Sequence, residues 1–127
     1  CSAGWESYDD NCYSLIKTDA LTWMEAEGQC KEWGAHLVSI LSQNEMDFIH
    51  DLLVQNEVFN TGTYIGLTDT DEEGIWRWVD SGQKAIYSYW EVRQNTYSEP
   101  DGSFLENCAV ILLSSLRGHR SWRDVPC

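Results

Sequence analysis

Positive charge is scarce in this sequence. Only eight of the 127 residues are Lys or Arg, against 21 Asp or Glu, so the formal net charge is -13. Nucleic acids and anionic membrane surfaces are bound by clustered Lys and Arg, so neither is an expected partner. An excess of carboxylates is typical instead of proteins that bind cations, or of proteins kept soluble by their charge.

Long apolar runs are also missing. No stretch approaches the ~20 apolar residues that span a bilayer, so we expect no membrane insertion. No signal peptide is visible, and the chain begins at Cys1 as a processed secreted protein would. The sequence contains no Asn-x-Ser/Thr acceptor for glycosylation either.

The five cysteines show none of the spacings typical of zinc or redox sites. No CxxC pair and no His-rich cluster accompanies positions 1, 12, 30, 108 and 127. Scattered cysteines in a small acidic domain indicate structural disulfides, and hence a secreted or extracellular protein. Because the number of cysteines is odd, one thiol needs a separate explanation.

The first half of the chain predicts two helices within a folded single domain. The sequence is 43% apolar with seven Trp, and its length fits one domain over residues 1–127. Thr22 with Glu25, and Ser42 with Glu45, each match the capping box that marks a helix start. Apolar residues at helical spacing follow each start, and they are Trp23, Ala26, Cys30 and Trp33, then Met46, Ile49 and Leu53.

The second half favours strands. Residues 63–67, 75–79 and 108–113 are short runs rich in β-branched and aromatic side chains. Helices followed by strands indicate an α+β fold. A long polar stretch separates the last two runs, and it contains the acidic-proline-acidic triplet Glu99-Pro100-Asp101. Long loops in compact domains are usually functional or disordered, so we place the candidate site there.

Ordered motifs along the whole chain resemble the C-type lectin-like domain family. Its opening hairpin is similar to GWESYDDNCYSL, and its two helices with an intervening strand HLVSI are similar to TWMEAEGQCKEWGAHLVSILSQNEMDFI. Its core strand and site strands resemble YIGLTDTDEEGIWRWVDSG, ENCAVI and SWRDVPC. The resemblance implies a C-type lectin-like fold with two helices, small antiparallel sheets and a long binding loop. The ending resembles the pancreatic stone protein branch, and an invertebrate-type member is the other interpretation.

The resemblance also implies how the cysteines pair. It gives disulfides Cys1–Cys12 and Cys108–Cys127, and it pairs Cys30 with a cysteine in a final strand that the sequence lacks after Cys127. Either the sequence is truncated before that strand, or Cys30 is a free buried thiol. An interchain disulfide is disfavoured, because the helical face that carries Cys30 is predicted to point inward.

A calcium and sugar site on the long loop is a further implication of the resemblance. Sugar-binding members carry Glu-Pro-Asn or Gln-Pro-Asp there, usually with a cis proline. Calcium takes about 6–8 oxygen ligands, and the primary ligands implied here are Glu99, Asp101, Glu106 and Asp124. The implied carbohydrate contacts are those four residues together with Pro100, Arg123 and a stacking Tyr97.

Two departures from the family pattern bear on this site. The triplet has two acids where the family has one acid and one amide, so both groups only accept hydrogen bonds. Arg123 stands where the family has Asn, and Arg is permanently charged and pairs well with carboxylates. Arg123 would therefore either replace the ion by pairing with Glu99 or Asp101, or swing into solvent and leave an incomplete calcium shell.

Alternatives remain for each cation position. In many relatives the triplet starts four residues after the loop tryptophan, and four after Trp90 lies Gln94, so Gln94 and Asn95 are alternative site residues. Otherwise the triplet is an ordinary solvated turn. An auxiliary calcium site is implied at Asp69 and Glu73, with Glu106 as a bridge. Because Gly102 and Asn107 stand where further acids are expected, a capped and solvated acidic turn is the alternative.

Together these residues predict a secreted, non-catalytic lectin that binds sugar hydroxyls through the long loop, with calcium as cofactor. Its partners would be glycans or glycoproteins, and a homo- or hetero-oligomer would strengthen weak single-sugar binding. The alternative is a protein-recognition domain that has lost calcium-dependent sugar binding, which Arg123 and the doubly acidic triplet favour. An enzyme is not expected, because no nucleophile–base pair accompanies the carboxylates.

Overall fold

The computed structural model describes residues 1–93, 97–115 and 119–127. Its main sheet is antiparallel, with strand order β4-β3-β7-β8, and two small hairpins pair β1 with β2 and β5 with β6. The elements are β1 (Glu6–Tyr8), β2 (Asn11–Tyr13), α1 (Trp23–Glu32), α2 (Gln43–Gln55), β3 (Gly62–Thr68), β4 (Arg77–Trp78), β5 (Val92–Arg93), β6 (Tyr97–Ser98), the short 3-10 helix η1 (Ser103–Leu105), β7 (Cys108–Leu113) and β8 (Arg120–Val125). The predicted α+β fold is confirmed.

Helix α1 begins with the predicted capping box. The Thr22 hydroxyl accepts from the Glu25 N–H at 3.2 Å, and the Glu25 carboxylate accepts from the Thr22 N–H at 2.8 Å. Trp23 is buried, and Ala26 and Cys30 are partly buried on the predicted face. Trp33 was wrongly placed on that face. It follows the last helical residue as the C-cap and is 56% exposed.

Helix α2 begins with only half of its predicted capping box. The Ser42 hydroxyl accepts from the Glu45 N–H at 3.2 Å. The Glu45 carboxylate does not reach back to Ser42, because it accepts from the Leu41 N–H at 2.7 Å and from the Tyr13 hydroxyl at 2.6 Å. The predicted inner face is confirmed by the burial of Met46, Ile49 and Leu53.

The segment HLVSI, which was expected to be a strand, joins no sheet. Val38 accepts one backbone hydrogen bond from the Gly66 N–H at 2.8 Å. The Leu37 N–H is taken by the Glu27 carboxylate at 2.8 Å, so the segment cannot form a regular ladder with β3. Gly66 is needed for this close approach, because a Cβ there would lie 2.6 Å from the Leu37 carbonyl oxygen.

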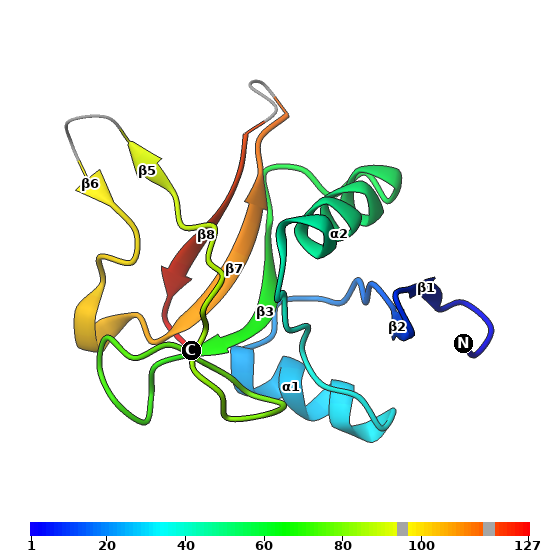
Figure 1. The fold of residues 1–127 in the computed structure, drawn as a ribbon, viewed down its shortest axis with the longest axis horizontal. Coiled ribbons are helices and arrows are strands. Elements are labelled where there is room, and N and C mark those ends of the chain that lie inside the picture. The colour runs from blue at the N-terminus through cyan, green and yellow to red at the C-terminus, as the bar shows by residue number, and fades with distance from the viewer. Residues whose placement is uncertain (94–96, 116–118) are drawn as a thin grey trace.

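The core lies between the main sheet and the helices. β7 is buried along almost its whole length, and the core also contains Trp76, Trp78 and Trp122, which are 8%, 2% and 0% exposed. The predicted strand over 75–79 is shorter, at Arg77–Trp78. Figure 1 shows the helices and the β1–β2 hairpin beside the central strands, with the β5–β6 hairpin on the opposite side. No helix in the described ranges is both long and apolar enough to cross a membrane.

The two expected disulfides are present. Cys1–Cys12 closes the β1–β2 hairpin with a Cα–Cα distance of 5.5 Å. Cys108–Cys127 joins the start of β7 to the chain just after β8 with a Cα–Cα distance of 5.1 Å. The second bridge fixes the end of β8, and β8 carries Arg123 and Asp124 towards the long loop.

Candidate functional site

Asp124 fastens the long loop to the main sheet. It pairs with Ala109 across the β7–β8 ladder, and its side chain is buried. The Asp124 carboxylate accepts from the Asp101 N–H at 3.0 Å and from the Gly102 N–H at 2.8 Å. The Glu99-Pro100 peptide bond immediately before is cis. The loop acids are therefore positioned by backbone hydrogen bonds to one buried carboxylate.

Three carboxylates from the loop and β8 converge. Oxygen atoms of Glu99, Asp101 and Asp124 lie within 4.8 Å of one another. Burial, followed by the neighbouring carboxyls of Asp124 and Asp101, raises the pKa of Glu99 to about 8. Burial, followed by the charges of Asp124 and Asp101, also raises the pKa of Glu106. The acids repel one another, and a cation among them would offset that repulsion.

The same loop forms one wall of a small polar cavity of about 200 Å³. Asp101 and Asp124 line this cavity as well as belonging to the cluster of three. Its acidic lining residues are Asp69, Glu73, Asp101, Glu106 and Asp124. The expected primary and auxiliary ligands thus lie around one connected acidic region, although Glu106, Asp69 and Glu73 are not within the tight cluster.

Buried oxygens without a partner are concentrated in this region. Within the described part of the chain, the buried side-chain polar atoms that lack a hydrogen bond are Asp69 Oδ1, Glu99 Oε2 and Asn107 Oδ1. An unpaired buried acceptor costs about 1–3 kcal/mol. All three atoms are oxygens, the ligand type that calcium binds. The chemistry of this donor set therefore fits a hard cation.

The absence of a side chain at Gly102 leaves space for the side chain of Glu106. A Cβ on Gly102 would lie 2.2 Å from Glu106 Oε2 and 2.3 Å from Glu106 Cβ. The family has an acid where this chain has glycine, and here the space is filled by Glu106 itself. The glycine removes one expected ligand of the auxiliary position and allows another acid to line the cavity.

Arg123 makes a contact that the sequence did not indicate. Its Nε donates a hydrogen bond to the carboxylate of Glu91, with side chains 30% and 16% exposed respectively. Neither expected arrangement, pairing with Glu99 or Asp101 or pointing into solvent, describes this contact. The partner was missed because Glu91 is distant in sequence. The Tyr97 side chain, Gln94 and Asn95 lie outside the described residues.

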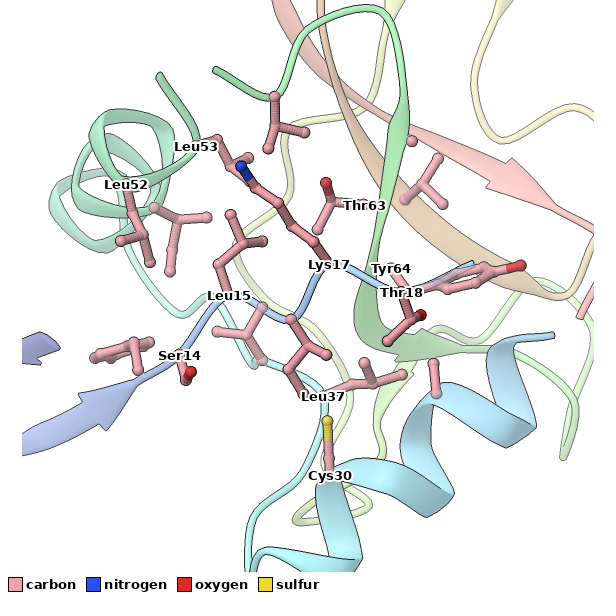
Figure 2. Close-up of a pocket in the computed structure, with 18 of the residues that line it drawn as sticks. Ser14, Leu15, Lys17, Thr18, Cys30, Leu37, Leu52, Leu53, Thr63 and Tyr64 are labelled. Carbon is pink, nitrogen blue, oxygen red and sulfur yellow. The ribbon is translucent and has the colours of Figure 1, made fainter. Parts of the chain in front are cut away.

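The protein also has an apolar groove of about 1210 Å³, and its lining includes none of the acids of the cluster or of the small cavity. It is lined by the segment after β2, both helices and β3, and Figure 2 shows Cys30 projecting from α1 towards Leu37. Cys30 is a free thiol. In the described part of the chain, residues 14–21 form no hydrogen bond between backbone groups. The groove therefore combines an apolar lining with a thiol.

Comparisons with known proteins define the class. The description "Lectin C-type domain" matches residues 19–127. The chain is 36% identical over 129 residues to mouse (Mus musculus) C-type lectin domain family 4 member E, covering all of this chain and 55% of that protein. It is 30% identical to the perlucin-like protein of Mytilus galloprovincialis, covering all of this chain and 76% of that protein. The chain belongs to the C-type lectin domain family.

A solved structure agrees in fold. The C-type lectin domain of murine dendritic cell inhibitory receptor 2, solved in complex with N-glycan, is 30% identical with a TM-score of 0.78. The match covers all of this chain and 90% of that one. The chain spans about half the length of the mammalian lectins that it matches in sequence, at 55% and 54% for two of them.

Proposed function

We propose that this chain is a non-catalytic glycan-binding domain that holds calcium at the acidic cluster of Glu99, Asp101 and Asp124. The observation that supports it most is the convergence of these three carboxylates, of which Glu99 has a buried oxygen without a hydrogen-bond partner. Membership of a lectin family supports sugar as the ligand class. Two disulfides favour a secreted or extracellular location.

Glu99, Asp101, Glu106 and Asp124 would hold the ion. When bound, calcium supplies coordination positions that sugar hydroxyls can occupy. Asp124 keeps the loop in position by accepting from two of its N–H groups. The carboxylates of Glu99 and Asp101 can only accept, so each hydroxyl that reaches them must donate its proton. Asp69 and Glu73 would hold a second, auxiliary ion, with Glu106 between the two positions.

Carbohydrate contact would extend along the loop and β8. Pro100 lines the acidic cavity together with Asp101. The guanidinium of Arg123 has N–H groups besides the one that binds Glu91, and these can donate to a sugar oxygen. Tyr97 would stack against a sugar ring. These roles remain proposals, and so does an oligomer that presents several such sites together.

A glycan array read with and without EDTA tests this function. Wild-type protein should bind glycans in calcium and lose binding in EDTA, and Glu99→Gln should bind weakly in both conditions. Glu32→Gln is a matched control, because Glu32 is exposed at the end of α1 and the substitution removes the same carboxylate group. Binding that persists in EDTA and in Glu99→Gln would disprove the ion-bridged mechanism.

Protein recognition is the second candidate function. The short helix η1 carries Phe104 and Leu105, which are 76% and 82% exposed, directly between the loop acids Asp101 and Glu106. Exposed apolar side chains beside a polar site are typical of protein interfaces. A protein ligand that binds equally well in calcium and in EDTA, together with an array free of glycan signals, would favour this function.

The apolar groove supports one further part of the family pattern. We propose that it accepts a strand carrying a cysteine that pairs with Cys30, as the resemblance implies. The Cys127 carbonyl accepts from the Trp23 N–H at 2.9 Å, which places the end of β8 beside the start of α1. Peptide mapping of the natural protein under non-reducing conditions should recover Cys30 in a disulfide. Recovery of a free Cys30 would contradict this proposal.

A further inference from the structure

Glu91 joins three segments next to the acidic cluster. Its N–H donates to the Trp122 carbonyl at 2.9 Å, and its own carbonyl accepts from the Glu99 N–H at 2.8 Å. Its carboxylate accepts from Arg123 Nε. Glu91 therefore contacts β8, the residue that opens the acidic triplet, and Arg123, whose positive charge opposes the rise in the pKa of Glu99.

The guanidinium of Arg123 lies within electrostatic reach of the cluster. Its Nε binds the carboxylate of Glu91, and the Glu91 carbonyl accepts from the Glu99 N–H at 2.8 Å, so Glu91 links Arg123 to the first acid of the triplet. Burial raises the pKa of Glu99, the acids Asp124 and Asp101 add to the effect, and the Arg123 charge opposes it. Arg carries five N–H donors in a planar fork that suits carboxylates. Without a partner of its own, this group would be drawn to the nearest acids of the cluster.

We propose that Glu91 is a positioning residue that holds the Arg123 guanidinium away from Glu99 and Asp101 and so keeps the cluster available to a cation. The Glu91–Arg123 pair is partly buried, so it is screened less than a surface pair. If Glu91 is neutralised, Arg123 competes with calcium for the same oxygens. This inference rests on the proposed calcium site, and it explains how a binding site can contain an arginine where the family has an amide.

A double-mutant cycle on calcium affinity tests the competition. We expect Glu91→Gln to weaken calcium binding about three- to tenfold. Arg123→Gln should strengthen calcium binding more in the Glu91→Gln background than in the wild-type background, by a factor of at least about three. The reason is that the guanidinium occupies the cluster only after Glu91→Gln has released it. Glu32→Gln, with the same loss of charge, should leave affinity nearly unchanged. Purely additive effects would overturn the inference, since a distant charge acts independently of Glu91.

A measurement without calcium separates this inference from the proposed function. In calcium-free protein, the ¹⁵N–¹H signal of Arg123 Nε should be protected from solvent exchange, and Glu91→Gln should shift it while the signals of other arginines stay in place. An Arg123 Nε signal that exchanges like a free arginine in the wild type would overturn the inference. If the wild type binds no calcium, the proposed function fails, and the Nε signal still decides whether Glu91 holds Arg123.

Discussion

Replacing Gly102 with Ala tests whether Glu106 lines the cavity because the glycine leaves it room. Gly102 has φ -79° and ψ -8°, an ordinary right-handed conformation that Ala adopts without strain. The difficulty is space alone. A Cβ on Gly102 would lie 2.3 Å from Glu106 Cβ and 2.4 Å from Glu106 Cγ. Because Glu106 Cβ is fixed to the backbone, the loop itself must move.

Inserting a methyl group into a filled space costs about 1–3 kcal/mol. For a domain of this length, each kcal/mol lowers Tm by roughly 4 °C. We therefore expect Gly102→Ala to melt about 4–12 °C below the wild type. Calcium affinity should fall about tenfold or more, because Glu106 is displaced from the other acids. Differential scanning calorimetry and calcium titration measure the two effects.

Gly28→Ala is the matched control for Gly102→Ala. Nothing lies within 4 Å of a Cβ at Gly28, and its position inside α1 favours Ala by about 0.5–1 kcal/mol. Gly28→Ala should therefore melt slightly higher, with unchanged calcium affinity. If Gly102→Ala melts with the wild type and binds calcium equally well, the reasoning about Glu106 is refuted.

Three further predictions concern the scaffold. Glu25→Gln should lower the free energy of unfolding measured in urea at neutral pH, because hydrogen bonds from Thr22 lower the pKa of Glu25 and act only while it is ionised. The difference from the wild type should shrink as the pH falls below the ordinary pKa of 4.5. A difference that stays constant with pH would contradict this. Met46→Ala should cost about 2–5 kcal/mol and shift tryptophan fluorescence, because the Met46 sulfur accepts from the Trp122 indole N–H at 3.4 Å; unchanged stability would argue against that contact. In the 127-residue chain, where Cys30 is a free thiol, Cys30 should react with iodoacetamide more slowly than in the unfolded chain, because burial and then the Glu27 charge raise its pKa; equal rates would disprove this.

Local sequence patterns predicted the helices and strands whose formation depends on interactions between residues close in sequence. The Thr22 capping box and the apolar spacing of Met46, Ile49 and Leu53 depend on neighbours within one or two helical turns, and the helices formed as expected. The apolar run 108–113 coincides with β7. The resemblance supplied the disulfide pairing, which spacing alone left open.

Contacts between residues distant in sequence could not be predicted from the sequence. The Glu45 carboxylate accepts from the hydroxyl of Tyr13, 32 residues away, instead of completing the expected capping box. Glu27 is buried on α1, where its carboxylate accepts from the Leu37 N–H at 2.8 Å and lies 2.6 Å from Nδ1 of the His36 ring. No periodicity indicates such partners, because they meet only after the chain has folded. The same holds for the contact of Arg123 with Glu91.

The candidate site could be predicted only in part, because motif positions indicate some of its residues and atomic packing determines the others. The triplet and Asp124 follow motif positions of the family, so their convergence could be anticipated. The filling of the space beside Gly102 by Glu106 depends on atomic packing in this chain alone. Such packing decides how many acids surround the cavity, and the order of residues in a motif does not reveal it.

Isothermal titration of calcium into the wild-type protein and Glu99→Gln tests the central claim most directly. Our account predicts saturable binding to the wild type that EDTA reverses, and markedly weaker binding to Glu99→Gln. Weak extracellular calcium sites have Kd values up to about 1 mM. The absence of saturable binding at about tenfold that concentration would contradict the claim that these converging carboxylates form a cation site.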